Sequence, residues 1–187
     1  MIYTVVFDAC VLYPAPLRDF LLRLSITGLF SAKWTDMIHE EWIRNLSKNR
    51  PELAGKLART RELMNKAVPD SLVTNYESLI DDLELPDVDD RHVLAAAIRS
   101  GAQAIITFNL KDFPQEVLGQ YGIEAIHPDA FIEYQLDLHQ GAVITAAKQH
   151  RESLNNPPKS PSNYIDTLAA QGLAISADRF REFIELI

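Results

Sequence analysis

Short strand-like runs alternate with longer helical stretches over the first two thirds of the chain, and this alternation limits the fold more than any other feature. The first run, Ile2 to Phe7, is too apolar for a half-exposed strand and suits the middle of a parallel sheet. Four later runs read similarly: "LFSAKW" (29–34), "SLVTNY" (71–76), "QAIITF" (103–108) and "IEAIHP" (123–128). Strands that alternate with helices are joined by crossovers, so the pattern predicts an α/β fold with a central parallel sheet layered by helices.

The intervening stretches carry the signals that start and stop helices. Thr35 is a good N-cap for a helix that runs to about Lys48, and Asp36 in its first turn complements the helix dipole. Gly101 is a good left-handed terminator for a helix that begins at Asp89 or Asp90. Two further helices are predicted over about 17–27 and 51–67.

The length and composition fit a globular α/β domain with an extension. The chain has 187 residues, 47% hydrophobic and 24% charged, and no apolar run approaches the ~20 residues that a membrane span needs. The first residues lack the basic, apolar and small-residue order of a signal peptide, and Cys10 is the only cysteine. We therefore expect a soluble protein of the reducing cytoplasm, without a membrane association.

After about His127 the alternation gives way to helices alone. Four helical candidates follow, with the proline-rich loop "NNPPKSPS" (155–162) between the second and third. We expect two domains, residues 1–127 with the sheet and residues 128–187 as a helical extension. The apolar spacing of the extension suggests that it packs on the sheet domain or on a second subunit, as in a homodimer. A DNA-reading helix-turn-helix is disfavoured, because only Arg179 and Arg181 supply positive charge in the last pair.

Acidic and amide side chains follow the predicted strands, where ligands bind in open parallel sheets. Asp8 ends the first run, and Asn109 and Asp112 follow "QAIITF". Helical geometry tests the remaining acids. Asp90 lies near the middle of the apolar stripe of its helix, whereas Asp89 falls to one side. A core-facing carboxylate costs several kcal/mol unless it is paired or bound to a metal.

The helix after Thr35 offers one further inward acid. Ile38, Trp42 and Leu46 form its buried face, which places Glu41 beside that face and Glu40 nearly opposite. Asp8, Glu41, Asp90 and Asp112 can then aim at one place, with Asn109 beside them and no basic partner. A divalent cation would relieve their repulsion. Ligands that are all oxygen select Mg²⁺ or Mn²⁺, ions that support phosphodiester hydrolysis.

Each acid also has a plainer interpretation. Asp8 can bond loop amides after its strand, and Asp90 can be only an N-cap, although Asp87 and Asp89 offer caps as well. Glu41 can pair with Arg44 or Lys48 along the helix surface, an interaction worth only a few tenths of a kcal/mol. Asp112 can be a loop aspartate bonded to its own backbone.

The ordered segments "VVFDACVLYP", "EEWIRNL" and "DVDDRHVLAAAIRSGAQAIITFNLKDF" resemble the PIN-domain ribonucleases, and among them the VapC-type toxins of toxin–antitoxin pairs. The resemblance covers residues 1 to 127 and is strongest between Asp87 and Phe113. It implies a PIN-like α/β/α sandwich and a metal-dependent endoribonuclease. A minority of PIN proteins carry a helical extension, to which residues 128–187 are similar.

The resemblance also implies roles for individual residues. Asp8, Glu41 and Asp90 match the first three family acids, which hold Mg²⁺ or Mn²⁺ and perform catalysis. Asp112 is our choice for the fourth, although many relatives carry an aspartate at the place of Asn109, so the division of labour between these two stays open. Thr107 matches a helper that bonds to a ligand or to metal-bound water. RNA is the implied substrate and a cognate antitoxin the implied protein partner.

Positive charge is concentrated in one stretch, although the net charge is −8. We call this stretch, residues 44–66, the basic stretch; it contains Arg44, Lys48, Arg50, Lys56, Arg59, Arg61 and Lys66 against Glu52 and Glu62. Residues 70–90 hold eight acids and no lysine or arginine. The acids suit a metal and the basic stretch suits RNA phosphates, with Arg44, Lys48, Arg59 and Arg61 as the proposed contacts. The alternative is an ordinary solvated helix surface.

Other chemistries fit the sequence poorly. No G-x-G-x-x-G supports a dinucleotide site, and the five histidines lack the spacing of zinc ligands. Cys10 lies where a phosphoaspartyl enzyme would carry its second aspartate, and no phosphate-binding loop follows it. The main rival is a PIN-like module that binds RNA or protein without cutting.

Overall fold

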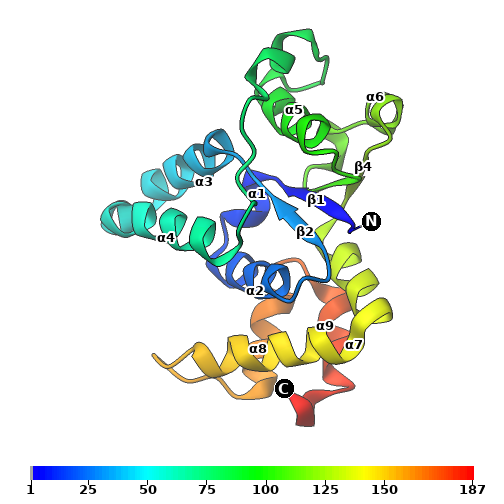
Figure 1. The fold of residues 1–187 in the computed structure, drawn as a ribbon. Helices are drawn as coiled ribbons and strands as arrows, with labels where there is room; N and C mark the ends of the chain where they lie inside the picture. The colour runs from blue at the N-terminus through cyan, green and yellow to red at the C-terminus, as the bar shows by residue number, and fades with distance from the viewer. Residues whose placement is uncertain (1) are drawn as a thin grey trace. The chain divides into compact units, whose positions relative to one another are not determined.

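The structure is a computed structural model and describes residues 2–187. Its sheet has four parallel strands in the order β2-β1-β3-β4. They are β1 (Thr4–Phe7), β2 (Ser31–Lys33), β3 (Ala104–Ile106) and β4 (Glu124–Ile126) (Figure 1). The predicted α/β class and parallel sheet are confirmed, and four of the five strand-like runs supply the strands.

The central strands β1 and β3 form the middle of the core. Val5, Val6 and Ile105 are fully buried, as expected for strands covered on both faces. In register, Val6 pairs with Ile105 and Phe7 with Ile106. The two strands therefore end together, and the residues that follow each of them meet at one edge of the sheet.

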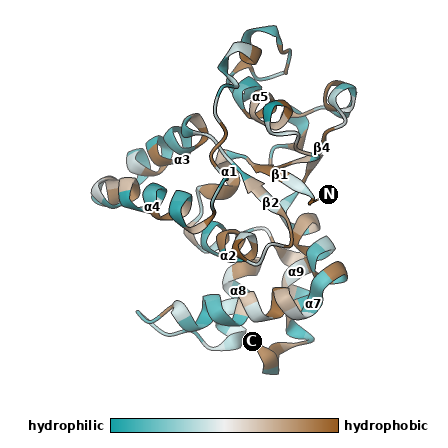
Figure 2. Ribbon diagram, in the orientation of Figure 1, coloured by the Kyte–Doolittle hydropathy of each residue, from teal (hydrophilic) through white to brown (hydrophobic). Residues whose placement is uncertain are grey.

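Five helices belong with the sheet: α1 (Ala9–Leu12), α3 (Asp36–Asn49), α4 (Ala54–Ala67), α5 (Arg91–Ser100) and α6 (Gln115–Leu118). Thr35 caps α3 by accepting a hydrogen bond from the Ile38 amide at 3.1 Å, and Gly101 ends α5 with a left-handed φ of 64°. Both predictions are confirmed. The helices α3, α4 and α5 carry both apolar and polar residues, as expected for amphipathic helices with one face toward the core (Figure 2).

Two local features differ from the sequence prediction. "SLVTNY" is not a strand: only Leu72 forms a bridge, to Trp34. Asp70 and Asn75 have φ values of 61° and 60°, so the chain turns before and after that bridge and cannot stay extended. The short helix α1 was not predicted, because four apolar residues are too few to show helical periodicity.

The remaining helices form a second unit: α2 (Ala15–Ile26), α7 (Pro128–Ser153), α8 (Pro161–Ala169) and α9 (Ala174–Arg181). Its core includes Phe20, whose ring lies 5.8 Å from that of Phe180 and 6.2 Å from that of His150. The prediction of two helices before the proline-rich loop is close, since α7 is interrupted at His139 by a non-helical φ of −146°.

Contacts divide the chain into two compact units. One contains the residues up to Tyr13 together with Phe30–His127, and the other contains Pro14–Leu29 together with Pro128–Ile187. The sheet-containing unit ends at His127, and α2 groups with the C-terminal helices rather than with the sheet. Within residues 2–187, no helix is long and apolar enough to cross a bilayer.

Candidate functional site

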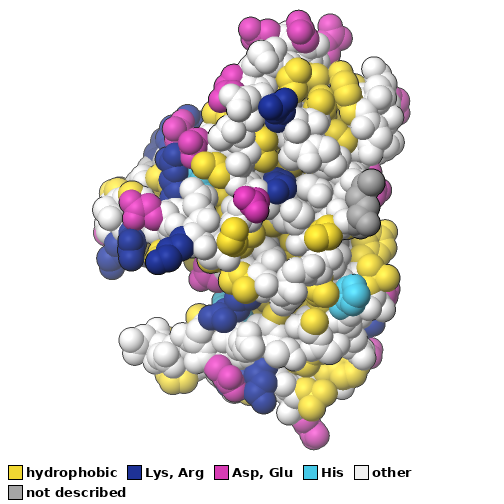
Figure 3. Space-filling model, in the orientation of Figure 1, with side chains coloured by type: hydrophobic (Ala, Val, Ile, Leu, Met, Phe, Trp, Pro, Cys, Tyr) yellow, Lys and Arg dark blue, Asp and Glu magenta, His cyan; other side chains and the backbone are white. Residues whose placement is uncertain are grey.

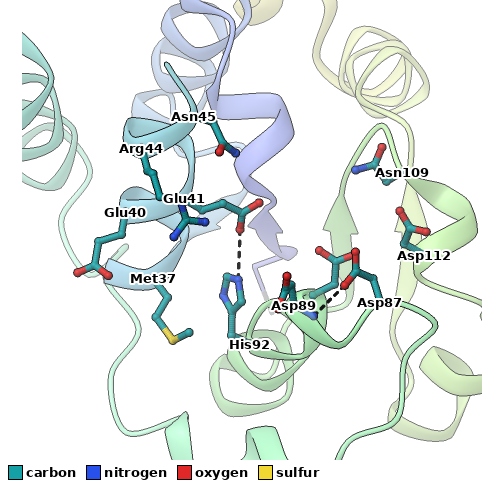
Figure 4. Close-up of a pocket in the computed structure, with 11 residues that line it drawn as sticks. Met37, Glu40, Glu41, Arg44, Asn45, Asp87, Asp89, His92, Asn109 and Asp112 are labelled. Carbon is teal, nitrogen blue, oxygen red and sulfur yellow. Dashed lines mark hydrogen bonds and ion pairs between the residues drawn. The ribbon is translucent and has the colours of Figure 1, made fainter. Parts of the chain in front are cut away.

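A hollow of about 510 Å³ lies in the sheet-containing unit, beyond the ends of the central strands (Figure 4). It is bounded by α3, by the turn that leads into α5 and by the loop after β3. Six of its eleven lining residues are carboxylates: Glu40, Glu41, Asp87, Asp89, Asp90 and Asp112. The others are Met37, Arg44, Asn45, His92 and Asn109. Of the four acids predicted from the sequence, Glu41, Asp90 and Asp112 line the hollow, together with Asn109, and Asp8 does not.

Asp8 stands where β1 passes into α1 and is only 2% exposed. Its Oδ1 accepts a hydrogen bond from the Ala9 amide at 2.7 Å, and its Oδ2 accepts one from the Thr107 hydroxyl at 2.7 Å. The Cys10 thiol donates to the same Oδ2 at 3.1 Å. Burial raises the pKa of Asp8, and the charge of Glu41 raises it further, while these three hydrogen bonds act in the opposite direction.

Thr107 connects the end of β3 to Asp8. The side chain is fully buried. Its hydroxyl donates a hydrogen bond to Asp8 and accepts one from the backbone N–H of Asn109 at 3.0 Å. One hydroxyl therefore fixes both the Asp8 carboxylate and the start of the loop that carries Asn109 and Asp112. The plainer interpretation of Asp8, as a residue that bonds loop amides, describes only its Oδ1.

Glu41 extends from α3 into the hollow and meets His92 at the start of α5 (Figure 4). The Nε2 atom of His92 lies 3.3 Å from Oε2 of Glu41. The Nδ1 atom of His92 is buried without a hydrogen-bond partner among the described residues. A proton on Nδ1 would be buried with no acceptor, so the proton belongs on Nε2, which donates to Glu41. The alternative pairing of Glu41 with Arg44 or Lys48 is not found within residues 2–187.

Asp90 shows that the acids affect one another. Its pKa is raised to about 7, first by burial and then by the negative charges of other carboxylates. These are Asp8, Asp87, Glu41 and Asp112. The three other predicted acids therefore all lie within electrostatic reach of Asp90. Asp90 occupies the N-cap position of α5, but its side chain makes no capping hydrogen bond, whereas Asp87 accepts one from the backbone amide of Asp89 at 2.9 Å. Capping therefore does not account for the Asp90 carboxylate.

Asn109 precedes a short 3-10 turn after β3, Asp112 is the last residue of that turn, and both line the hollow. The Asp112 amide donates to the Asn109 carbonyl at 3.0 Å, which closes the turn through backbone atoms alone. Their side chains make no hydrogen bond to other described residues and are directed toward the hollow (Figure 4). These contacts do not decide whether Asn109 or Asp112 occupies the fourth position of the predicted metal site.

The donor set fits a hard divalent cation, although the side chains do not already enclose one. Among residues 2–187, no three Asp, Glu, His or Cys side chains lie close enough to form a ready metal cage. The facing groups are nevertheless carboxylate and amide oxygens, which Mg²⁺ and Mn²⁺ prefer. Burial and, after it, the charges of neighbouring carboxylates raise the pKa of Asp90, and a cation would compensate those charges.

The predicted RNA contacts divide into two groups. Arg44 lines the hollow, and Lys48 is exposed one helical turn further along α3. On α4, Arg59 pairs with Glu62 at 3.2 Å and Arg61 pairs with Asp36 of α3, so part of their charge is compensated. Lys and Arg side chains gather on the surface over α4 (Figure 3).

Sequence reasoning missed two residues that contact the predicted acids. His92 was set aside with the other histidines because none has zinc-ligand spacing, and Cys10 was considered only as a nucleophile. Burial and the charge of Asp8 raise the pKa of the Cys10 thiol, which makes it a poor nucleophile. The partner of His92 lies 51 positions away, and no local signal points to it.

Comparison with known proteins agrees with this fold. The PIN domain family model matches residues 4–111, more than half of the chain, and the chain therefore belongs to the PIN domain family. Residues 128–182 match the family model of the VapC50 C-terminal domain. The chain is thus a VapC-type PIN protein with a C-terminal helical extension, as the sequence resemblance predicted.

One curated relative has a related name. The chain is 42% identical over 94 residues to a protein of Mycobacterium tuberculosis called "Putative ribonuclease VapC50". The matched region covers 50% of this chain and 56% of that relative. The comparison thus spans little more than half of the relative's length. No solved structure gave a significant match.

Proposed function

We propose that this protein is a metal-dependent endoribonuclease that hydrolyses RNA phosphodiester bonds at the acidic hollow. The observation that carries the proposal is that Glu41, Asp90 and Asp112, from separate parts of the chain, line one hollow. The buried Asp8 lies close enough for its charge to raise the pKa of Asp90. A PIN domain and a relative named as a ribonuclease support the same reaction.

The proposed roles follow from the positions of the side chains. Asp8, Glu41, Asp90 and Asp112 would hold Mg²⁺ or Mn²⁺, which when bound activates water and stabilises charge on the phosphate. Thr107 orients Asp8 by donating to its Oδ2, and Asn109 offers an amide beside Asp112. Arg44 at the hollow can attract an RNA phosphate, which lets a protein of net charge −8 hold a polyanion locally.

The wider biological role rests on the relatives. VapC-type proteins are toxins of toxin–antitoxin pairs, so we propose a cognate antitoxin as the protein partner. A homodimer that forms through the second unit, here called the C-terminal unit (Pro14–Leu29 with Pro128–Ile187), is a further proposal. The rival function is binding of RNA or protein without cleavage, but the presence of all four acids favours the enzyme.

Cleavage of RNA with and without metal tests the proposal. Purified full-length protein is incubated with end-labelled single-stranded RNA in Mg²⁺, in Mn²⁺ and in EDTA. We expect internal cleavage with either metal and none with chelator. The Asp8→Asn variant, purified in parallel, controls for contaminating ribonucleases. RNA binding without cleavage under all metal conditions supports the rival function instead.

A further inference from the structure

A second hollow, of about 420 Å³, adjoins the acidic one in the sheet-containing unit. Its lining residues are Ala9, Cys10, Tyr13, Glu41, Trp42, Asn45, Asn49 and Asn109. Glu41, Asn45 and Asn109 line both hollows, so the two spaces meet at these side chains. The volume lies in the range of pockets that hold small organic groups.

The chemistry of the second hollow differs from that of the first. Glu41 is its only charged lining residue, whereas the acidic hollow has six carboxylates. Three asparagine amides and the Tyr13 hydroxyl replace them. Such a lining offers no net attraction to a phosphate. It suits an uncharged, planar group with both hydrogen-bond donors and acceptors.

The geometry of α3 places the amides in a row that starts at the acidic site. Glu41, Asn45 and Asn49 are spaced by four residues, so they lie on one stripe of the helix at successive turns. A rise of about 1.5 Å per residue separates neighbouring members by about 6 Å along the axis. Asn109, in the loop after β3, lines the same space. A ligand anchored at Glu41 can therefore extend past the amides.

Two of these amides have unused hydrogen-bonding capacity. Asn49 donates to the Tyr13 hydroxyl at 2.8 Å, which steadies both side chains. Asn45 and Asn109 make no side-chain hydrogen bond to the rest of the chain that the structure describes. An asparagine amide presents an acceptor and two donors, the pattern that pairs with the edge of a nucleobase.

We propose that the second hollow is a nucleobase subsite, which holds one unpaired base of the RNA next to the phosphodiester bond that is cleaved. Asn45 and Asn109 read the edge of the base, and Asn49 with Tyr13 forms the far wall. The inference rests on the proposed function, because it places the scissile phosphate at the acidic hollow. It also restricts the substrate to single-stranded RNA, since a base must leave its stack to enter.

Cleavage preference measures the contribution of the amides. Wild type, Asn45→Ala, Asn49→Ala and the double variant are incubated with Mn²⁺ and short single-stranded RNAs that differ only in the base next to the cleaved bond. For wild type we expect a rate ratio of about fivefold or more between the best and worst base, and a ratio near one for the double variant. Asn163→Ala, an exposed asparagine of α8, is the matched control and should keep the wild-type ratio.

The rate ratio separates this inference from the proposed function. A wild-type enzyme that cleaves all bases equally, or variants that keep the full preference, would overturn the subsite while leaving the nuclease intact. If wild type cleaves no RNA, the proposed function fails and a binding measurement decides the subsite.

Nuclear magnetic resonance supplies that measurement without cleavage. The four ribonucleosides are titrated at millimolar concentration into ¹⁵N-labelled full-length protein. The side-chain amide signals of Asn45 and Asn49 are assigned by their disappearance in the alanine variants. We expect at least one nucleoside to shift these signals and ribose alone to leave them unchanged. No shift with any nucleoside overturns the inference.

Discussion

The Nε2 atom of His92 donates a hydrogen bond to Oε2 of Glu41 across 3.3 Å, and the imidazole is almost completely buried. This contact joins the first turn of α5 to the middle of α3. It fixes the direction of Glu41 while leaving its charge available to a cation. His92 is therefore a positioning residue for the proposed metal site.

Replacing His92 should weaken metal binding. His92→Ala frees the Glu41 side chain, and loss of a group that orients a ligand typically costs about 10- to 100-fold in metal affinity. His92→Gln can still donate to Glu41 and should recover part of that loss. Mn²⁺ affinity measured by calorimetry on each variant, without RNA, reports the effect directly.

The exposed His139 in the C-terminal unit provides a matched control, because His139→Ala removes an imidazole that contacts no proposed ligand. Equal Mn²⁺ affinity for wild type, His92→Ala and His139→Ala would show that His92 only fills space.

Asp8→Asn should abolish cleavage and leave the fold intact. The variant removes a negative charge from the proposed ligand set but keeps a side chain of the same shape between Ala9 and Thr107. The cleavage rate should fall by more than ~100-fold, which is the largest loss typical of residues that only orient a metal ligand. Cleavage rate and circular dichroism are measured on the same preparation. Asp82→Asn, an exposed acid, serves as control. Full activity in a folded Asp8→Asn protein would contradict the proposed site.

Asp90→Asn should stabilise the metal-free protein at pH 8 while removing cleavage. The folded pKa of Asp90 is about 7, above its ordinary value of 3.8, so ionisation of this group increasingly favours the unfolded chain as pH rises from about 4 through 7. Asparagine removes that penalty. After allowance for solvent screening of a partly exposed group, we expect a gain of roughly 1 kcal/mol in the free energy of unfolding.

Urea unfolding in EDTA at pH 8 and pH 4 measures this gain. The gain should be present at pH 8 and absent at pH 4. At pH 4 the Asp90 carboxyl of the wild type is protonated in the folded state and partly protonated in the unfolded state, so its charge no longer penalises folding. A variant less stable than wild type at pH 8 would mean that Asp90 makes a net stabilising contribution without metal.

Acidification should destabilise the C-terminal unit through His150. Burial, followed by the charge of Arg23, lowers the pKa of this histidine from 6.5 to about 4, and its Nδ1 lies 2.9 Å from the Tyr164 hydroxyl. Since the unfolded chain takes up the proton first, the free energy of unfolding should fall as pH drops from 6.5 to 4, by up to about 3 kcal/mol. It should then level off below pH 4.

Urea unfolding of wild type and His150→Gln between pH 4 and 7 isolates this contribution. The variant should be less stable at pH 7 but lose less stability on acidification. His39, buried in the other unit, also has a lowered pKa through burial and remains in both proteins. Parallel pH profiles for the two proteins would exclude His150 as a source of the acid sensitivity.

Arg44 should contribute more to RNA binding than the arginines of α4. Arg44→Ala should reduce the slope of log affinity against log salt by about 0.7, the value for one phosphate contact on a single strand. The double variant Arg59→Ala/Arg61→Ala should also weaken binding and reduce the slope. The reduction should be smaller than the value expected for two phosphate contacts, because Glu62 and Asp36 already pair with these arginines.

Binding is measured with single-stranded RNA in EDTA at several salt concentrations. Arg99→Ala on α5, outside the lining of the acidic hollow, is the control. An unchanged slope for both sets of variants would remove the basic stretch from the model of substrate binding.

Local sequence signals predicted the features that neighbouring residues determine. Thr35 and Gly101 mark helix ends because capping involves atoms within a few positions. Asp8 and Asp112 are candidates because the carboxyl ends of parallel strands share one edge. "SLVTNY" misled the prediction, since its β-propensity was overridden by two left-handed residues that turn the chain.

The sequence by itself determined the parallel α/β class, the helical extension and the set of acids proposed to act together, because periodicity, caps and strand ends are encoded within short windows. Only the tertiary structure decided that His92 supports Glu41, that Thr107 fixes Asp8, and that α2 groups with the C-terminal helices. These relationships join segments far apart in the chain, and their partners are selected by packing, which no short window of sequence contains.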